Sequence, residues 1–411
     1  MKAELLIKNI SMLATATGSS AKAGKEQGEI SIQENVWVAV NDGKIAEIGS
    51  GEPAVEAEQV VDAQNRLVTA GLVDAHTHLV FGGWRADELA LKLHGVPYLE
   101  ILAKGGGILS TVRSTRAASE DELCDKTAQA LDEMLSLGTT TCEAKSGYGL
   151  NMETELKQLN VVKRLNETQP VELVSTFMAA HAVPQEYKEN REEYIRQIIE
   201  EMIPYVAEHK LAKYCDIFCE TGVFTAEESR KILLVAREYG LEPKIHADEI
   251  DPIGGSQLAG EINAVSAEHL IVCPPEGIES MAKGGTIACL LPATSFYLGA
   301  TFAPARDMVN ANVPVAVASD FNPGSTPNLS LQLAMNIACF KYRLTPEEVL
   351  TAATLNAAAA IGCADKVGTV EVGKQADLLV WNAPSLNYIF YRYGNNLVDT
   401  VIKKGKIVKS K

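Results

Sequence analysis

Short apolar runs alternate with longer amphipathic stretches through the middle of the chain. At residues 121–137 and 191–208, apolar side chains recur at helical spacing while the opposite face is charged, which predicts two helices that cover a core. Strands that alternate with such helices are typical of α/β proteins with a parallel sheet, and the predicted fold is a (β/α)₈ barrel. The eight predicted strands span residues 72–75, 139–144, 172–179, 216–219, 242–246, 264–267, 286–291 and 315–318.

The two ends of the chain carry a different pattern, with short alternating runs rich in β-branched residues. These runs span residues 4–8, 36–49, 59–69, 370–381 and 398–408. The turn sequence Gly-Lys-Ile at residues 43–45 recurs at residues 405–407. We therefore predict that both termini build one small composite β-domain, a β-sandwich. The expected division is 1–66 and 361–411 for the β-domain and 67–360 for the barrel.

Composition narrows the classes of function. The formal charge of −16 disfavours binding to nucleic acid or to an anionic membrane surface, so we expect a small-molecule substrate. Glu4, Lys8 and Asn9 interrupt the first apolar run too early for a signal sequence, and no later stretch is long and apolar enough to span a membrane. Eight cysteines lie scattered without paired spacing, which indicates a reducing cytoplasm.

Chemically reactive residues follow several of the predicted strands. The C-terminal ends of barrel strands meet at one mouth, so these residues are expected to converge there although they lie far apart in the sequence. Of the seven histidines in the chain, His94 and His209 lie in helical or loop patterns and receive no role. The other five end predicted strands: His76, His78, His181, His246 and His269.

A metal site is the chemistry that these histidines favour. His76 and His78 stand two residues apart, which places both rings on the same side of an extended strand, and His246 and Asp320 end the fifth and eighth strands. Three imidazoles and a carboxylate suit zinc or iron, with a position left for water. The alternative for His76 and His78 is two polar residues that leave a strand for a loop, and for His246 and Asp320 a polar residue satisfied at a barrel rim. His269 is either a fifth ligand or a neighbour that hydrogen-bonds the bound water, and we favour the second.

Two further residues complete a hydrolytic site. Glu249 stands three residues after His246, where it can take a proton from a metal-activated water and return it to a leaving nitrogen. The oxygen of the attacked carbonyl gains negative charge, which the metal and a protonated His269 can stabilise. We therefore expect Glu249 and His269 to be catalytic.

These motifs resemble the amidohydrolase superfamily, whose hallmark is His-x-His after strand one, His after strands five and six, and Asp after strand eight. The resemblance covers nearly the whole chain, including residues 71–78 and 373–378. Members with two metals usually bridge them with a lysine at the end of strand four. Residues 216–220 read Asp-Ile-Phe-Cys-Glu, without a lysine, so the resemblance implies one metal per chain.

Within the superfamily, the loops resemble those of the cyclic-amide hydrolases of histidine breakdown. The similar segments are residues 83–88, 105–108, 145–150, 180–184, 246–249 and 319–325. This resemblance implies hydrolysis of 4-imidazolone-5-propanoate to N-formimidoyl-L-glutamate and a homodimer. It also makes the triple glycine at residues 105–107 a candidate part of a loop facing the substrate; without it, a flexible turn is the expectation.

Substrate contacts are expected from the loops at the barrel mouth. Arg85 offers a planar fork suited to a carboxylate, and the alternative is a surface charge. Tyr148 and His181 can bind the ring nitrogen or a carboxylate oxygen, whereas packing or loop hydrogen bonds are their alternatives. A small polar turn after the eighth strand can approach the substrate closely. Its candidate residues are Asn322, Gly324 and Ser325.

Two other functions fit parts of this pattern. A deaminase of a purine, pyrimidine or related heterocycle would share the metal ligands and the role of Glu249. A neutral base, however, would give Arg85 no carboxylate to bind. A non-catalytic scaffold of the same fold would have lost ligands that are all present here, so hydrolysis is the favoured function.

Overall fold

Eight parallel strands form the barrel that the apolar pattern predicts. The computed structural model describes residues 2–96 and 105–410. Neighbouring strands pair in sequence order from the first to the last, and each of the eight predicted barrel strands is confirmed to within two residues. The strands are β5 (Leu72–Asp74), β6 (Thr139–Lys145), β7 (Glu172–Ala180), β8 (Tyr214–Cys219), β9 (Glu242–Ala247), β10 (Ser266–His269), β11 (Ile287–Leu290) and β12 (Val315–Val317).

The barrel closes where the segments after β5 and β12 meet. Thr77 and Phe321 form a parallel bridge. The backbone N–H of His78 donates to the carbonyl of Phe321 at 2.9 Å, and that of Asp320 donates to the carbonyl of His76 at 3.1 Å. Closure therefore brings the loops after the first and last strands side by side.

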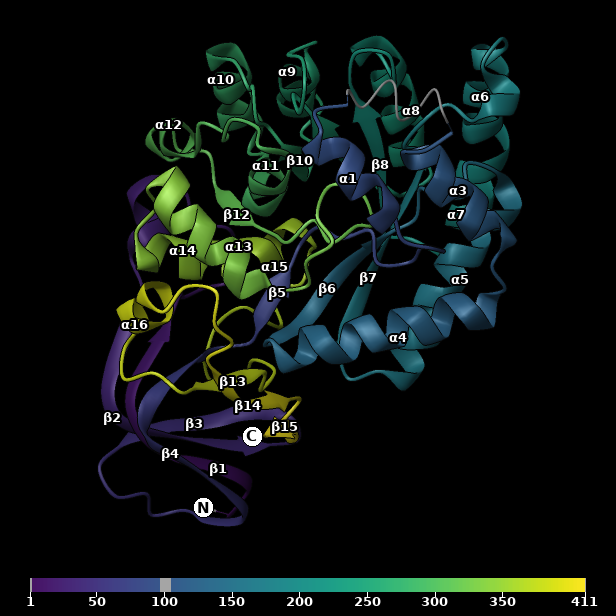
Figure 1. Ribbon diagram of the computed structural model, residues 1–411. Helices are drawn as coiled ribbons and strands as arrows, with labels where there is room; N and C mark the ends of the chain where they lie inside the picture. Colours follow the sequence, from purple (N-terminus) through teal and green to yellow (C-terminus); the bar gives the residue numbers. More distant parts are fainter. Residues whose placement is uncertain (1, 97–104, 411) are drawn as a thin grey trace.

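Helices surround the barrel strands (Figure 1). The predicted helix at 121–137 is α4 (Glu120–Ser136), which begins with a capping box between Ser119 and Glu122. The predicted helix at 191–208 runs through α6 (Arg191–Gln197), a π-helical turn (Ile198–Met202) and α7 (Ile203–Glu208), with Pro204 near the start of α7. None of the helices described between residues 2 and 410 is both long and apolar enough for a bilayer.

The remaining α-helices that the structure describes connect or cover the strands. They are α1 (Leu89–Leu93), α3 (Ile108–Ala117), α5 (Met152–Thr168), α8 (Ala226–Glu238), α9 (Gly255–Glu261), α10 (Pro275–Gly284), α11 (Pro292–Leu298), α12 (Ala305–Asn310), α13 (Leu331–Ile337), α14 (Pro346–Ala352), α15 (Leu355–Ala360) and α16 (Leu386–Tyr391).

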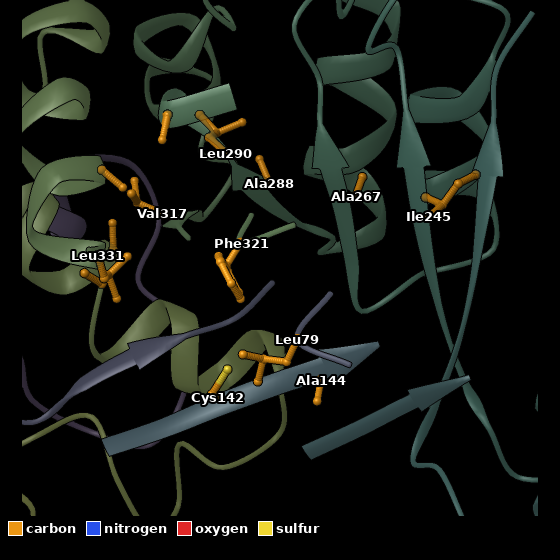
Figure 2. Close-up of a cluster of buried hydrophobic side chains, with 14 of the residues drawn as sticks. Leu79, Cys142, Ala144, Ile245, Ala267, Ala288, Leu290, Val317, Phe321 and Leu331 are labelled. Carbon is orange, nitrogen blue, oxygen red and sulfur yellow. The ribbon is translucent and has the colours of Figure 1, made fainter. Parts of the chain in front are cut away.

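A continuous apolar core fixes the strands against these helices. Figure 2 shows Ile245, Ala267 and Ala288 on the neighbouring strands β9, β10 and β11, and Leu331 at the start of α13. All four residues are fully buried. Burial of such side chains removes apolar surface from water at roughly 25 cal/mol per Å². The dense packing holds the strands in place and thereby the loops at their C-terminal ends.

Both chain ends contribute to a second, seven-stranded sheet, as predicted (Figure 1). Leu379 pairs with Thr69, which joins the C-terminal strands to the N-terminal ones. The strand expected at 370–381 forms only from Leu378, because the backbone turns before it, where Lys374 donates its N–H to the carbonyl of Glu371. The sheet runs β15 (Lys406–Ser410), β14 (Val398–Lys403), β13 (Leu378–Trp381), β4 (Glu56–Ala70), β1 (Lys2–Thr15), β2 (Ser31–Asn41) and β3 (Lys44–Ser50).

A buried lysine connects this sheet to the barrel. Nζ of Lys403, on β14, lies 2.7 Å from carboxylate oxygens of both Glu172, at the start of β7, and Asp377. Only 3% of the Lys403 side chain is exposed. Because β4 continues across residue 66, the division of the chain at residues 66 and 360 stays a proposal.

Candidate metal and active site

The four predicted metal ligands meet at the barrel mouth. Nε2 of His76 lies 3.5 Å from Oδ1 of Asp320, and Nε2 of His78 lies 3.8 Å from the same oxygen. Nε2 of His246 lies 3.4 Å from Nε2 of His78. None of the four residues is more than 3% exposed. Side chains from three different strand ends therefore lie together at the barrel mouth.

This group fits a metal ion. Among the described residues, Nε2 of His76 is buried without a hydrogen-bond partner, an arrangement that costs free energy unless the nitrogen binds something else. The ligand atoms of His76, His78 and His246 lie within 4.8 Å of one another, as do those of His76, His269 and Asp320. Imidazole nitrogens with a carboxylate oxygen are a donor set that zinc and iron accept.

The electrostatic environment keeps His76 and His78 in the neutral form that binds metals. Burial lowers the pKa of His76, and the charge of Lys145 adds to that effect. Burial also lowers the pKa of His78, with neighbouring imidazoles adding to it. Burial raises the pKa of Asp320 to about 6, and the hydroxyl of Thr294 donates to its Oδ2 at 2.5 Å. The rings are thus neutral at neutral pH, and a cation would favour ionised Asp320.

Two buried carboxylates orient the rings of His76 and His246. Nδ1 of His76 lies 2.7 Å from Glu268, and Nδ1 of His246 lies 3.1 Å from Asp216. With Nδ1 donating to a carboxylate, each ring keeps Nε2 for a metal. Sequence reasoning gave neither carboxylate a role. The available signal was an acidic residue inside or at the end of an otherwise apolar strand.

Glu249 and His269 lie beside the proposed ligands. Nε2 of His269 is 3.7 Å from Oε2 of Glu249. Burial raises the pKa of Glu249 to about 8, with the charges of Asp320 and Glu220 adding to it. Burial lowers the pKa of His269, which favours a neutral ring over the protonated one expected from the sequence. His269 lies close enough to Asp320 to fit either of its two expected roles.

Glu220 fixes the loop that carries Glu249. Its carboxylate, at the end of β8, accepts hydrogen bonds from the backbone N–H groups of Ile250 at 2.9 Å, Asp251 at 3.1 Å and Thr221 at 2.7 Å. This is the strand end where two-metal enzymes carry a bridging lysine. Here the side chain is engaged by the loop backbone.

Arg85 joins three of the predicted loops. Its Nε donates to Glu88 at 3.1 Å, and Glu88 accepts the backbone N–H of Gly107 at 2.6 Å. The guanidinium also lies against Gly324, where a β-carbon would be 2.4 Å from Nη1. The side chain of Arg85 is only 10% exposed, which contradicts the alternative of a surface charge. Gly107, last of the triple glycine, therefore belongs to the same loop cluster as Arg85.

The turn after Asp320 is shaped by Asn322. The Nδ2 group of Asn322 donates to the carbonyl of Asp320 and to Oγ of Ser325, each at 2.8 Å. Its Oδ1 accepts the N–H groups of Gly324 at 2.8 Å and Ser325 at 2.7 Å. The carboxamide therefore organises the turn, a role that the sequence did not indicate.

Aromatic rings form one wall of the site. The rings of His78 and His181 stack with centroids 4.9 Å apart, and the Tyr148 ring lies 5.3 Å from His181. Nδ1 of His181 lies 3.0 Å from the carbonyl of Gly147, and burial lowers the pKa of His181 to about 3. The ring of Phe218, which the sequence did not single out, has its centroid 6.2 Å from that of His181. Tyr148 and His181 thus stand next to the proposed metal ligands.

Solved structures share this fold at low sequence identity. A zinc-bound adenosine deaminase from Xanthomonas campestris has a TM-score of 0.75 at 19% identity, with 100% of this chain and 93% of that chain covered. A triazine hydrolase variant has a TM-score of 0.73 at 15% identity, with 99% and 94% covered. These likenesses establish the barrel architecture alone.

Sequence relatives are much closer. The amidohydrolase family model matches residues 67–408. An imidazolonepropionase from Alkaliphilus metalliredigens is 50% identical, with 100% of this chain and 99% of the relative covered. One from Fusobacterium nucleatum is 51% identical, with both chains covered completely. The chain therefore belongs to the amidohydrolase family, and within it to the imidazolonepropionases.

Proposed function

We propose that this chain hydrolyses 4-imidazolone-5-propanoate to N-formimidoyl-L-glutamate, a ring-opening step of histidine degradation. The observation that carries the proposal is a sequence identity of 50–51%, over 98–100% of the chain, to imidazolonepropionases from several bacteria. Membership of the amidohydrolase family makes the chain a metal-dependent hydrolase of carbon–nitrogen bonds in cyclic amides. Likeness to an adenosine deaminase at 19% identity is a likeness of fold and does not favour deamination.

One zinc or iron ion per chain is proposed to be held by His76, His78, His246 and Asp320. The buried, unpartnered Nε2 of His76 supports this assignment. When bound, the metal supplies a Lewis acid that polarises a carbonyl oxygen and acidifies a coordinated water. Zinc is bound in several solved structures of the same fold, but the donor set here accepts either metal.

Glu249 is proposed to move the proton. Its carboxylate takes a proton from the attacking water and delivers it to the ring nitrogen that leaves. The raised pKa of about 8 lies close to neutral pH, where both forms of the carboxyl group are populated, and a neighbouring cation would lower this pKa towards neutrality. A neutral His269, 3.7 Å away, is proposed to donate a hydrogen bond to the carbonyl oxygen as charge develops there.

The propionate tail is proposed to bind Arg85. Glu88 holds the guanidinium at its Nε, and the side chain is almost fully buried, so a carboxylate there would meet a preorganised cation. Tyr148 and His181 are proposed to contact the ring. Gly324 and Ser325 are proposed to approach the tail through their backbone, with Asn322 holding their turn.

Location and assembly are also proposals. The eight cysteines are all unpaired, which supports a cytoplasmic enzyme. A homodimer is proposed by similarity to the family.

A direct assay tests the proposed reaction. Purified protein is mixed with imidazolone propionate, and the ring absorbance and ammonia release are followed, with guanine and cytosine as controls. We expect the absorbance to fall without ammonia release and the two bases to stay unchanged. Turnover of either base with ammonia release, and none of the imidazolone, would replace the proposal with deamination.

A further inference from the structure

Five charged side chains lie inside the barrel without any exposure. They come from β6, β8, β9 and β10, and the proposed catalytic steps use none of them. Charges in such an interior are costly unless they are paired, so their presence calls for a physical reason. The five residues are Glu143, Lys145, Asp216, Lys244 and Glu268.

Their contacts form one unbroken line. Nζ of Lys145 lies 2.7 Å from Asp216 and 2.8 Å from Glu143. Nζ of Lys244 lies 2.7 Å from the other oxygen of Glu143 and 3.4 Å from Glu268. Glu143 therefore joins the two lysines, with Asp216 and Glu268 at the two ends.

Each end of this line reaches a proposed metal ligand. Oδ2 of Asp216 lies 2.7 Å from Nζ of Lys145, and both carboxylate oxygens of Asp216 lie 3.1 Å from Nδ1 of His246. Oε1 of Glu268 faces Lys244, while its Oε2 lies 2.7 Å from Nδ1 of His76. Glu268 thus divides its two oxygens between one lysine and one imidazole, whereas Asp216 contacts Lys145 through an oxygen that also lies beside the imidazole of His246.

These contacts restrict the rotation of the carboxylates. A carboxylate bound only to a histidine can turn about its last bond, whereas one that a lysine also contacts is held in place. The backbone N–H of Ile217 adds to this restraint at Asp216, and the hydroxyl of Ser266 adds to it at Glu268. Burial alone would lower the pKa of Lys145, but Asp216 and Glu143 outweigh burial and raise it, so the ammonium stays charged. The rings of His76 and His246 are therefore oriented by carboxylates that the two lysines hold in turn.

We propose that Lys145 and Lys244 are positioning residues of the metal site. Each lysine fixes the carboxylate that fixes one histidine ring, so that Nε2 of that ring faces the metal. The inference rests on the ligand set proposed above. Partners of a metal-bound histidine typically contribute 10- to 100-fold to metal affinity, and we expect about tenfold from these lysines, which stand one residue farther away.

Zinc affinity separates this role from a purely structural one. The metal-free forms of wild type, Lys145→Met and Lys244→Met are titrated with Zn²⁺ against a chromophoric chelator, and the visible spectrum of bound Co²⁺ reports the ligand geometry. Lys403→Met is the matched control, because Lys403 is also buried and paired with two carboxylates at 2.7 Å, but where the barrel meets the terminal sheet.

We expect both network variants to bind zinc about tenfold more weakly than wild type and to shift the Co²⁺ spectrum. Lys403→Met should lose thermal stability while keeping the wild-type affinity and spectrum. Because the two lysines share Glu143, the double variant should lose less affinity than the product of the two single losses. Wild-type zinc affinity and spectrum in both network variants would overturn the inference.

Milder changes keep the test decisive if the lysine variants do not fold. The hydroxyl of Thr176 donates to Glu143 at 2.6 Å, and that of Ser266 donates to Glu268. Thr176→Val and Ser266→Ala should each weaken zinc binding several-fold, and unchanged affinity in both would overturn the inference. Wild-type protein that binds neither Zn²⁺ nor Co²⁺ would instead overturn the ligand set, and the inference with it.

Discussion

The guanidinium of Arg85 packs on the backbone of Gly324, so closely that a β-carbon on this glycine would stand 2.4 Å from Nη1. The two residues lie in the loops after the first and the last barrel strands, which meet because the barrel closes between Thr77 and Phe321. A side chain at position 324 would have to displace the arginine. The contact therefore makes the glycine a requirement for the proposed carboxylate site.

Gly324→Ala should raise the KM for imidazolone propionate and leave metal content unchanged. Arg85→Met should raise it further, because loss of a charge-assisted contact at a desolvated site costs on the order of 2–5 kcal/mol. The double variant should resemble Arg85→Met alone, since both changes act through one contact. Gly28→Ala is the control, because a β-carbon at position 28 would lie 3.4 Å from Cγ of Glu348, which is an ordinary van der Waals contact. An unchanged KM in Arg85→Met would remove Arg85 from the substrate site.

Metal analysis of purified protein should find one equivalent of zinc or iron per chain. Glu220, at the strand end where a bridging lysine would stand, accepts hydrogen bonds from three backbone N–H groups, which disfavours its bridging two ions. His246→Ala should lower the metal content, since it deletes a ligand. Two equivalents, both required for activity, would contradict the mononuclear site.

Glu249→Gln should reduce kcat by roughly 10²- to 10⁴-fold while the metal stays bound, because it removes a proton carrier and preserves size. Steady-state kinetics and metal analysis of the same preparation check both parts. The pattern differs from that of His246→Ala, in which activity and metal are lost together. Near-native turnover with full metal content would move proton transfer to another group, with His269 the first candidate.

Low pH should weaken the contact between Glu172 and Lys403. Burial raises the pKa of Glu172, but Lys403 and neighbouring hydrogen bonds outweigh burial and hold it at about 2, below its ordinary value of 4.5. Because the folded-state pKa is the lower one, the carboxylate stabilises the fold above about pH 4.5, and this contribution disappears as the pH falls towards 2. With 37% of the side chain exposed, we expect about 1 kcal/mol.

Denaturant unfolding of wild type and Glu172→Gln checks this expectation. The stability difference between them should be largest near neutral pH and should shrink as the pH falls below about 4.5. A difference that stays constant across this range would mean that Glu172 acts through packing and not through its charge.

The alternation of apolar strands and amphipathic helices determined the barrel, because side-chain periodicity is a local property of the sequence that does not depend on tertiary contacts. It also placed His76, His246 and Asp320 at strand ends, and the topology of a barrel then requires these ends to converge. The convergence of the proposed ligands was therefore predictable before any contact was known. The shared terminal sheet followed in the same way, although the strand before Leu378 proved shorter than its pattern.

Contacts between distant strands were decided only by the tertiary structure. That Glu268 holds His76 depends on the register and twist of β10, and that Arg85 rests on Gly324 depends on how two loops fold over the closed barrel. The carboxamide of Asn322 likewise makes its hydrogen bonds within its own turn, to Asp320, Gly324 and Ser325, and this too is visible only in the tertiary structure. Periodicity fixes which face a side chain occupies, but its partners and its pKa depend on burial and distance, which arise only when the strands pack.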